Sequence, residues 1–182
     1  MSTMIRGLSR EEVAARVCHA LACAGIPVVL SGGAVVSIYC EDEYESFDLD
    51  FVRIGVARKV DGVMTELGYR QEGRYWTHPE TPFWVEFAPG PVQVGDSVVT
   101  EFAERRTAVG VLRLLAATEC VMDRLAGYYH WDDPQCLEQA VAVARRHAID
   151  VSRVKAWSER EGSLRKFQQF RDRLQSGERD AG

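Results

Sequence analysis

The chain has 182 residues, of which 46 % are hydrophobic and 27 % are charged, and its net charge is −5. This composition is that of an ordinary globular protein and excludes a disordered or fibrous one. The length fits one compact domain with a helical appendage rather than two independent domains.

Cysteine and histidine spacing excludes several kinds of site. The five cysteines are odd in number and show no C-x-x-C spacing, so neither a disulfide framework nor a zinc site is predicted, and most should be small buried side chains. The four histidines are scattered. No apolar run approaches the roughly 20 residues that span a bilayer, and the N-terminus lacks a signal pattern, so we expect a cytoplasmic protein without membrane contact.

A capping box begins the first predicted helix. Ser9 and Glu12 have the S-x-x-E spacing in which a hydroxyl and a carboxylate satisfy the first free amides of a helix. Apolar residues then recur at helical spacing until Gly25 and Pro27 end the helix. The β-branched residues 28–30 are typical of a buried strand.

A tight turn follows at Ser31, Gly32 and Gly33 and leads into a short predicted helix over residues 34–39. Two successive glycines let a backbone come close to a ligand, and the start of a helix offers free N–H groups to a phosphate. A glycine pair alone is more often a plain turn. Residues 41–46 are polar and acidic, which predicts a loop.

Two aspartates lie on the next predicted strand. Because side chains alternate along a strand, Phe47, Leu49 and Phe51 should point into the core, and Asp48 and Asp50 should share the opposite face. Their Cα atoms would lie about 6.6 Å apart, which allows both carboxylates to converge on one ion or one ion pair. The alternative is an amphipathic strand with an ordinary polar outer face.

A third carboxylate is predicted further along the chain. An amphipathic helix is expected over residues 56–67, and short strands over 69–71, 74–77 and 83–87. On the last of these strands Glu86 should face away from Val85 and Phe87, so it must be solvated or bound to something. Two more strands are predicted over residues 98–102 and 109–115.

The remainder of the chain has a helical pattern, with helices expected over residues 120–129, 134–146, 151–161 and 164–174. We expect residues 1–116 to form an α+β core and residues 117–182 to form a helical region that packs on the sheet or extends one edge of it. Between Arg145 and Arg179 there are ten Lys and Arg residues against five Asp and Glu. This excess could contact a polyanion, although solvated helix faces commonly look the same and are the favoured interpretation. Trp157, Phe167 and Phe170 are expected in the core rather than as stacking residues.

A glycine turn beside carboxylates on two strands is the arrangement that metal-assisted phosphoryl or nucleotidyl transfer requires. Oxygen ligands suit Mg²⁺, which keeps water and substrate phosphates in its remaining positions. Two such ions would stabilise the attacking and the leaving oxygens of an in-line displacement. We therefore expect one or two Mg²⁺ ions as cofactor, with Mn²⁺ as an alternative.

Three motifs carry a resemblance to a known family. The segments LSGGA (residues 30–34), SFDLDF (46–51) and WVEF (84–87) together resemble the minimal nucleotidyltransferases of the DNA polymerase beta superfamily, and most of all its small abortive-infection, toxin-type members. The resemblance covers roughly residues 25–90 and, more loosely, the helices up to about residue 144. It implies a mixed-sheet fold with packed helices, an NTP substrate and transfer of a nucleoside monophosphate with release of pyrophosphate.

The resemblance also implies roles for individual residues. Asp48, Asp50 and Glu86 would be the catalytic and metal-binding carboxylates, and Glu86 would also deprotonate the acceptor. The residues implied to serve the nucleotide are Ser31, Gly32, Gly33, Ser46, Arg124 and Asp133.

The acceptor remains open among an RNA such as tRNA, a protein hydroxyl and a small molecule. A second hypothesis is a non-catalytic module of the same fold that binds a partner such as a cognate antitoxin. A third is a metal-dependent phosphohydrolase, which would release inorganic phosphate from NTP.

Overall fold

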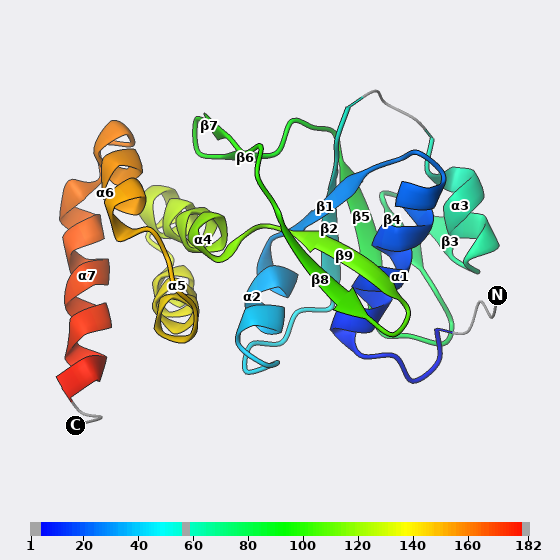
Figure 1. Ribbon diagram of the computed structural model, residues 1–182, viewed down its shortest axis with the longest axis horizontal. Helices are drawn as coiled ribbons and strands as arrows, with labels where there is room; N and C mark the ends of the chain where they lie inside the picture. The colour runs from blue at the N-terminus through cyan, green and yellow to red at the C-terminus, as the bar shows by residue number, and fades with distance from the viewer. Residues whose placement is uncertain (1–4, 56–58, 180–182) are drawn as a thin grey trace.

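A computed structural model describes residues 5–55 and 59–179 (Figure 1). The described helices are α1 (Arg10–Cys23), α2 (Gly33–Tyr39), α3 (Asp61–Glu66), α4 (Ala117–Trp131), α5 (Pro134–Arg146), α6 (Val151–Arg160) and α7 (Leu164–Arg179). The described strands are β1 (Val28–Ser31), β2 (Asp48–Arg53), β3 (Arg70–Glu72), β4 (Tyr75–Thr77), β5 (Trp84–Ala88), β6 (Gln93–Val94), β7 (Ser97–Val98), β8 (Ala103–Thr107) and β9 (Gly110–Leu114). The expected α+β class with a mixed sheet is confirmed.

Seven strands form one sheet in the order β3-β4-β5-β2-β1-β9-β8. Strand β2 pairs antiparallel with β1 and parallel with β5, and β1 pairs parallel with β9. Strands β6 and β7 form a separate small hairpin. The two strands that carry the candidate carboxylates are therefore neighbours in the middle of the sheet.

Helices α1 and α2 cover the core side of this sheet. Helix α1 packs on β9, β1 and β8, and α2 packs on β2 and β1. The predicted capping box of α1 is present, with Ser9 and Glu12 bonded reciprocally. Strand β1 is buried from Val28 to Leu30 because it lies between two partners and beneath both helices.

The C-terminal helices lie at one end of the molecule. Figure 1 shows α4 to α7 beside the sheet, with α7 at the opposite end from α3 and β3. Helices α4 and α5 pack on each other and on α2, while α6 and α7 pack on α4 and α5 respectively. The helical region thus reaches the sheet half largely through α2. A domain boundary at residue 116 stays a prediction.

The core contains the aromatic residues predicted for it. Trp157 and Phe170 are fully buried, and Phe167 is 3 % exposed. All five cysteines are unpaired; Cys18, Cys40 and Cys120 are buried, whereas the other two are at least partly exposed.

Within residues 5–55 and 59–179, no helix combines the length and apolar character that crossing a membrane requires.

Several sequence predictions were wrong. Phe47 precedes β2 instead of belonging to it, and its side chain is 39 % exposed rather than in the core. The strand predicted over residues 98–102 does not form, since β7 ends at Val98, and β8 begins only at Ala103. Helix α3 begins at Asp61, and the first three residues of the longer helix predicted there lie outside the described residues.

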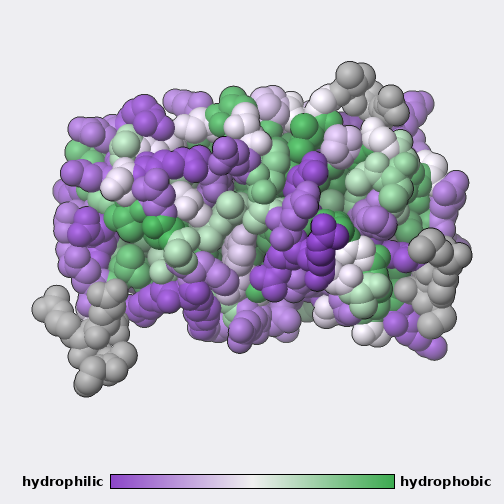
Figure 2. Space-filling view, in the orientation of Figure 1, coloured by the Kyte–Doolittle hydropathy of each residue, from purple (hydrophilic) through white to green (hydrophobic). Residues whose placement is uncertain are grey.

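Strand β8 was missed because its sequence is charged. It reads AERRT and forms the outer edge of the sheet. Figure 2 shows a hydrophilic surface over this part of the molecule. Charges on an edge strand oppose pairing with another chain. The charged residues that concealed β8 from a sequence pattern therefore also protect this edge from intermolecular pairing.

Candidate functional site

Asp48, Asp50 and Glu86 lie on one face of the sheet. Asp50 is paired with Glu86 in the parallel register of β2 and β5, and Asp48 is two residues before Asp50 on the same strand. Side chains two residues apart, and side chains of paired residues, point to the same side of a sheet. Leu49 and Phe51 alternate with the aspartates and are fully buried on the other side. The fold therefore brings the three carboxylates together.

These carboxylates repel one another. Burial, followed by the charges of Asp48 and Glu86, raises the pKa of Asp50 to about 6. Burial and the charge of Glu86 also raise the pKa of Asp48. The Oδ1 atom of Asp48 is buried without a hydrogen-bond partner. Burial and neighbouring negative charge therefore make both aspartates costly to ionise, and a bound cation would lower that cost.

The donor set fits Mg²⁺ because it consists of carboxylate oxygens alone. In the part of the chain that the structure describes, no group of three or more His, Cys, Asp or Glu side chains is placed so that it could hold a metal ion. Glu86 is engaged elsewhere, since its Oε1 lies 3.5 Å from Nε of Arg74. Mg²⁺ commonly takes one or two protein carboxylates and completes its shell with water and phosphate oxygens. Asp48 and Asp50 meet that requirement.

The glycine turn lies directly against Asp50. Gly32 has a φ of +71°, and a Cβ at this position would be 2.7 Å from Oδ2 of Asp50. At Gly33 a Cβ would be 3.3 Å from Oγ of Ser46. A side chain at Gly32 would therefore clash with a candidate ligand and strain the backbone. Gly32 thus leaves open the space next to Asp50, and Gly33 leaves open the space next to Ser46.

The two candidate serines hold the backbone of the aspartates. Ser31 Oγ donates to the carbonyl oxygen of Asp50 at 3.2 Å, and Ser46 Oγ donates to the carbonyl oxygen of Asp48 at 3.2 Å. In this arrangement the serines position β2, and contact with a nucleotide stays a prediction.

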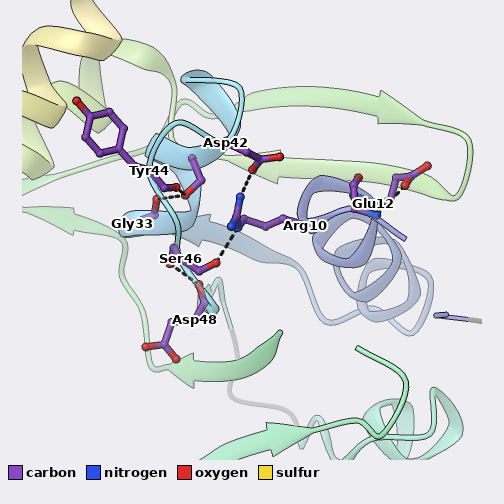
Figure 3. A network of polar contacts seen from close by, with 9 residues as sticks. Arg10, Glu12, Gly33, Asp42, Tyr44, Ser46 and Asp48 are labelled. Atoms are coloured by element: carbon purple, nitrogen blue, oxygen red, sulfur yellow. Dashed lines mark hydrogen bonds and ion pairs between the residues drawn. The ribbon is translucent and has the colours of Figure 1, made fainter. Parts of the chain in front are cut away.

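An arginine that the sequence interpretation missed fixes the loop before β2 (Figure 3). Arg10, on α1, is 6 % exposed. Its Nε donates to the carbonyl oxygen of Ser46 at 2.7 Å, and its Nη1 pairs with Asp42. Ser37 on α2 donates to the carbonyl oxygens of Gly33 and Tyr44 and ties the same loop to the glycine turn. An arginine in the first turn of a surface helix carries no signal by which a sequence pattern could find it.

Arg124 approaches the site from α4. Its charge lowers the pKa of Asp50, whereas the charge of Asp123 raises it. Arg124 donates from Nη2 and Nε to Oδ2 of Asp123, at 2.5 and 3.1 Å. Asp123, a second residue missed in the sequence, thus holds the guanidinium close to the carboxylates.

Asp133 has a local structural task. It precedes α5, and its carboxylate accepts from the backbone N–H of Gln135 at 2.9 Å and from the thiol of Cys136 at 3.4 Å. These are the contacts of a helix N-cap. A role for Asp133 toward a nucleotide stays a prediction.

Comparisons with known proteins add little to this geometry. No protein-family model and no curated protein shows significant similarity to the chain. One solved structure is similar over 94 % of this chain and 96 % of its own, with a TM-score of 0.43 and 14 % sequence identity. It is described as the solution structure of the antibiotic-resistance factor ANT(2'')-Ia, with substrate-regulated conformation dynamics. At this level of likeness, activity has to be argued from the side chains themselves.

Proposed function

We propose that this protein is a metal-dependent nucleotidyltransferase that moves a nucleoside monophosphate from an NTP to a hydroxyl group of an acceptor. The observation that supports this most is the placement of Asp48, Asp50 and Glu86 on one sheet face, with the turn at Gly32 directly against Asp50. The motifs that resemble the polymerase beta superfamily contain the same residues. An enzyme that consumes NTP would act in the cytoplasm.

The candidate site has a place for each part of the reaction. Asp48 and Asp50 would hold Mg²⁺ or Mn²⁺, which when bound supplies positive charge that stabilises the triphosphate and the departing pyrophosphate. Gly32 and Gly33 leave room for the triphosphate to approach the backbone. Arg124 adds a fixed positive charge on the α4 side of the site.

In the proposed transfer, the hydroxyl oxygen of the acceptor forms a bond to the α-phosphorus of the NTP. The bond from that phosphorus to the oxygen that bridges to the β-phosphate breaks, and pyrophosphate leaves with the electron pair. The Glu86 carboxylate accepts the proton of the hydroxyl group and passes it to solvent.

Calorimetric titration tests the binding step. NTP and Mg²⁺ should bind to the wild type and not to the Asp48→Ala/Asp50→Ala double variant. The exposed pair Glu104→Gln/Glu159→Gln, which removes two charges outside the site, serves as the matched control and should bind as the wild type does. Failure of the wild type to bind NTP with Mg²⁺ would end the catalytic proposal.

Product analysis separates the alternatives. The protein is incubated with each of the four α-labelled NTPs and a total cell extract, and the labelled molecule is identified. Pyrophosphate release with a labelled acceptor is the expected result, whereas release of inorganic phosphate would indicate a phosphohydrolase. A toxin-type enzyme should arrest growth on expression, and arrest should require Asp48 and Asp50. Arrest that survives their replacement would favour the non-catalytic interaction module.

A further inference from the structure

Three aromatic side chains form a platform next to the carboxylates. The platform consists of Phe47, Tyr75 and Trp84. The rings of Phe47 and Trp84 are stacked with centroids 6.1 Å apart, and Tyr75 meets Trp84 edge-on at 6.4 Å. Phe47 is 39 % exposed, and the other two side chains are partly exposed. Large aromatic rings left open to solvent beside a candidate site offer a surface for a ligand.

Strand register places the platform on the same face as the carboxylates. Trp84 is the partner of Asp48 on the neighbouring strand, and Tyr75 is the partner of Glu86. Paired residues on adjacent strands are about 4.8 Å apart and point to one side. The rings of Trp84 and Tyr75 therefore begin one strand spacing from the candidate catalytic groups.

The platform and the glycine turn flank the carboxylates from opposite directions. Across the sheet, β4 carries Tyr75, β5 carries Trp84 and Glu86, β2 carries the two aspartates, and β1 leads into the glycine turn. With the triphosphate on the side of the turn, the platform lies on the side of Glu86. In the proposed reaction Glu86 receives the proton of the acceptor, so this is the acceptor side.

The charge around the platform is negative. Asp48 and Glu86 are register partners of Trp84 and Tyr75, and Asp50 lies on the same face of β2. Arg74 lies 4.7 Å from the ring centroid of Tyr75, and it already pairs with Glu86. The basic helices α6 and α7 lie at the far end of the molecule from β3 (Figure 1). A polyanion would meet repulsion here rather than attraction.

We infer that the aromatic platform is the acceptor subsite, and that the acceptor is a small ring-bearing alcohol that is neutral or positively charged. This inference rests on the proposed nucleotidyl transfer and names the substrate class for it. Aromatic rings stack on the apolar face of another ring and attract cations through their negative faces. Stacking would hold the ring of the acceptor while its hydroxyl group faces Glu86 and the α-phosphorus.

Acceptor kinetics with four probes test the inference. The probes are adenosine, glucosamine, glucose 6-phosphate and a short RNA with a free 3′ hydroxyl, which differ in charge and size. The wild type should transfer label to adenosine or glucosamine in preference to the two anionic probes. Trp84→Leu and Tyr75→Leu should each raise the acceptor KM about tenfold, the loss expected for one stacking contact, and change the NTP KM less than twofold. Trp84→Phe keeps a ring and should stay near the wild type.

A remote tryptophan supplies the control. Trp131, the last residue of α4, is 82 % exposed, so Trp131→Leu removes an equally large ring outside the sheet and should leave both KM values unchanged. A preference for the RNA, a rise in the NTP KM, or acceptor kinetics of Trp84→Leu equal to the wild type would overturn the inference. Calorimetry with NTP and Mg²⁺ on the same variants separates the two proposals. If NTP binds and the platform variants behave normally, only the acceptor subsite is refuted, whereas absence of NTP binding refutes both.

Discussion

Replacing Asp50 with Asn should stabilise the metal-free protein at neutral pH. Burial and the charges of Asp48 and Glu86 raise the pKa of Asp50 from 3.8 to about 6, so ionising it destabilises the folded state. A shift of about 2 pKa units corresponds to about 3 kcal/mol. Solvent screening of a partly exposed carboxylate reduces this to about 1 to 2 kcal/mol of unfolding free energy.

The gain should depend on pH in a defined direction. The folded protein keeps a proton on Asp50 up to about pH 6, whereas the unfolded chain releases it near pH 3.8. The stability of the wild type therefore falls as pH rises through this window, and the loss is complete above it. The Asn variant does not titrate here, so its advantage should grow from near zero below the window to the full value above it.

Urea unfolding followed by circular dichroism, from about pH 4 to pH 8, measures this difference. For a chain of this size, 1 to 2 kcal/mol corresponds to a shift in Tm of about 2 to 8 °C. Glu159→Gln, on the exposed side of α6, is the control and should stay within about 0.5 kcal/mol at every pH. An Asn variant that is less stable than the wild type near pH 7.5, or a pH-independent difference, would refute the reasoning. Mg²⁺ should raise the Tm of the wild type and not of the variant.

Three further changes have defined outcomes. Gly32→Ala should lower the free energy of unfolding by about 1 to 3 kcal/mol more than Gly73→Ala does. Both positions have positive φ, but only Gly32→Ala would place a Cβ against Asp50, and thermal unfolding compares the two variants. Arg10→Met should cost about 2 to 3 kcal/mol and weaken NTP binding, because it frees the loop before β2; urea unfolding and calorimetry measure the two effects. Arg124→Met should raise the pKa of Asp50 further, because it removes a neighbouring positive charge; carboxyl ¹³C NMR titration reports it.

Each of these changes has an outcome that contradicts it. Equal losses for the two glycine variants would mean that the space beside Asp50 is not tight. An Arg10 variant with unchanged stability would show that its buried guanidinium is dispensable. A carboxyl pKa that stays constant in the Arg124 variant would place that guanidinium too far away to act.

Local signals predicted the centre of the fold well. The strand, turn and short helix from Val28 to Tyr39 follow from proline and glycine punctuation, which acts over a few residues. Period-two alternation predicted that Asp48 and Asp50 share one face, and it predicted that Glu86 faces away from Val85 and Phe87. A sequence pattern could not show whether the three acids share a face, because 30 residues of chain separate β2 from β5.

The failures have the same origin in long-range contacts. Phe47 looked like a core residue because it alternates with Leu49 and Phe51, but it precedes the strand and stacks on Trp84. The aromatic platform brings together residues from three segments, so no single stretch of sequence predicts it. Arg10 binds partners in the loop before β2, and Asp123 holds its neighbour Arg124 toward a carboxylate on β2, so their roles emerge only in three dimensions.

The order of the strands has a consequence for synthesis on the ribosome. Strand β1 emerges early, but its second neighbour, β9, ends only at Leu114, and the edge strand β8 comes just before it. A nascent chain that has exposed both glycines and all three acids still lacks one of the two strands that pair with β1. The sheet can close only after β9 has left the exit tunnel, when about two thirds of the polypeptide has emerged, and pairing between such distant strands is slow. Prematurely terminated products should therefore remain unfolded and open to proteolysis, rather than accumulate as a small nucleotide-binding fragment.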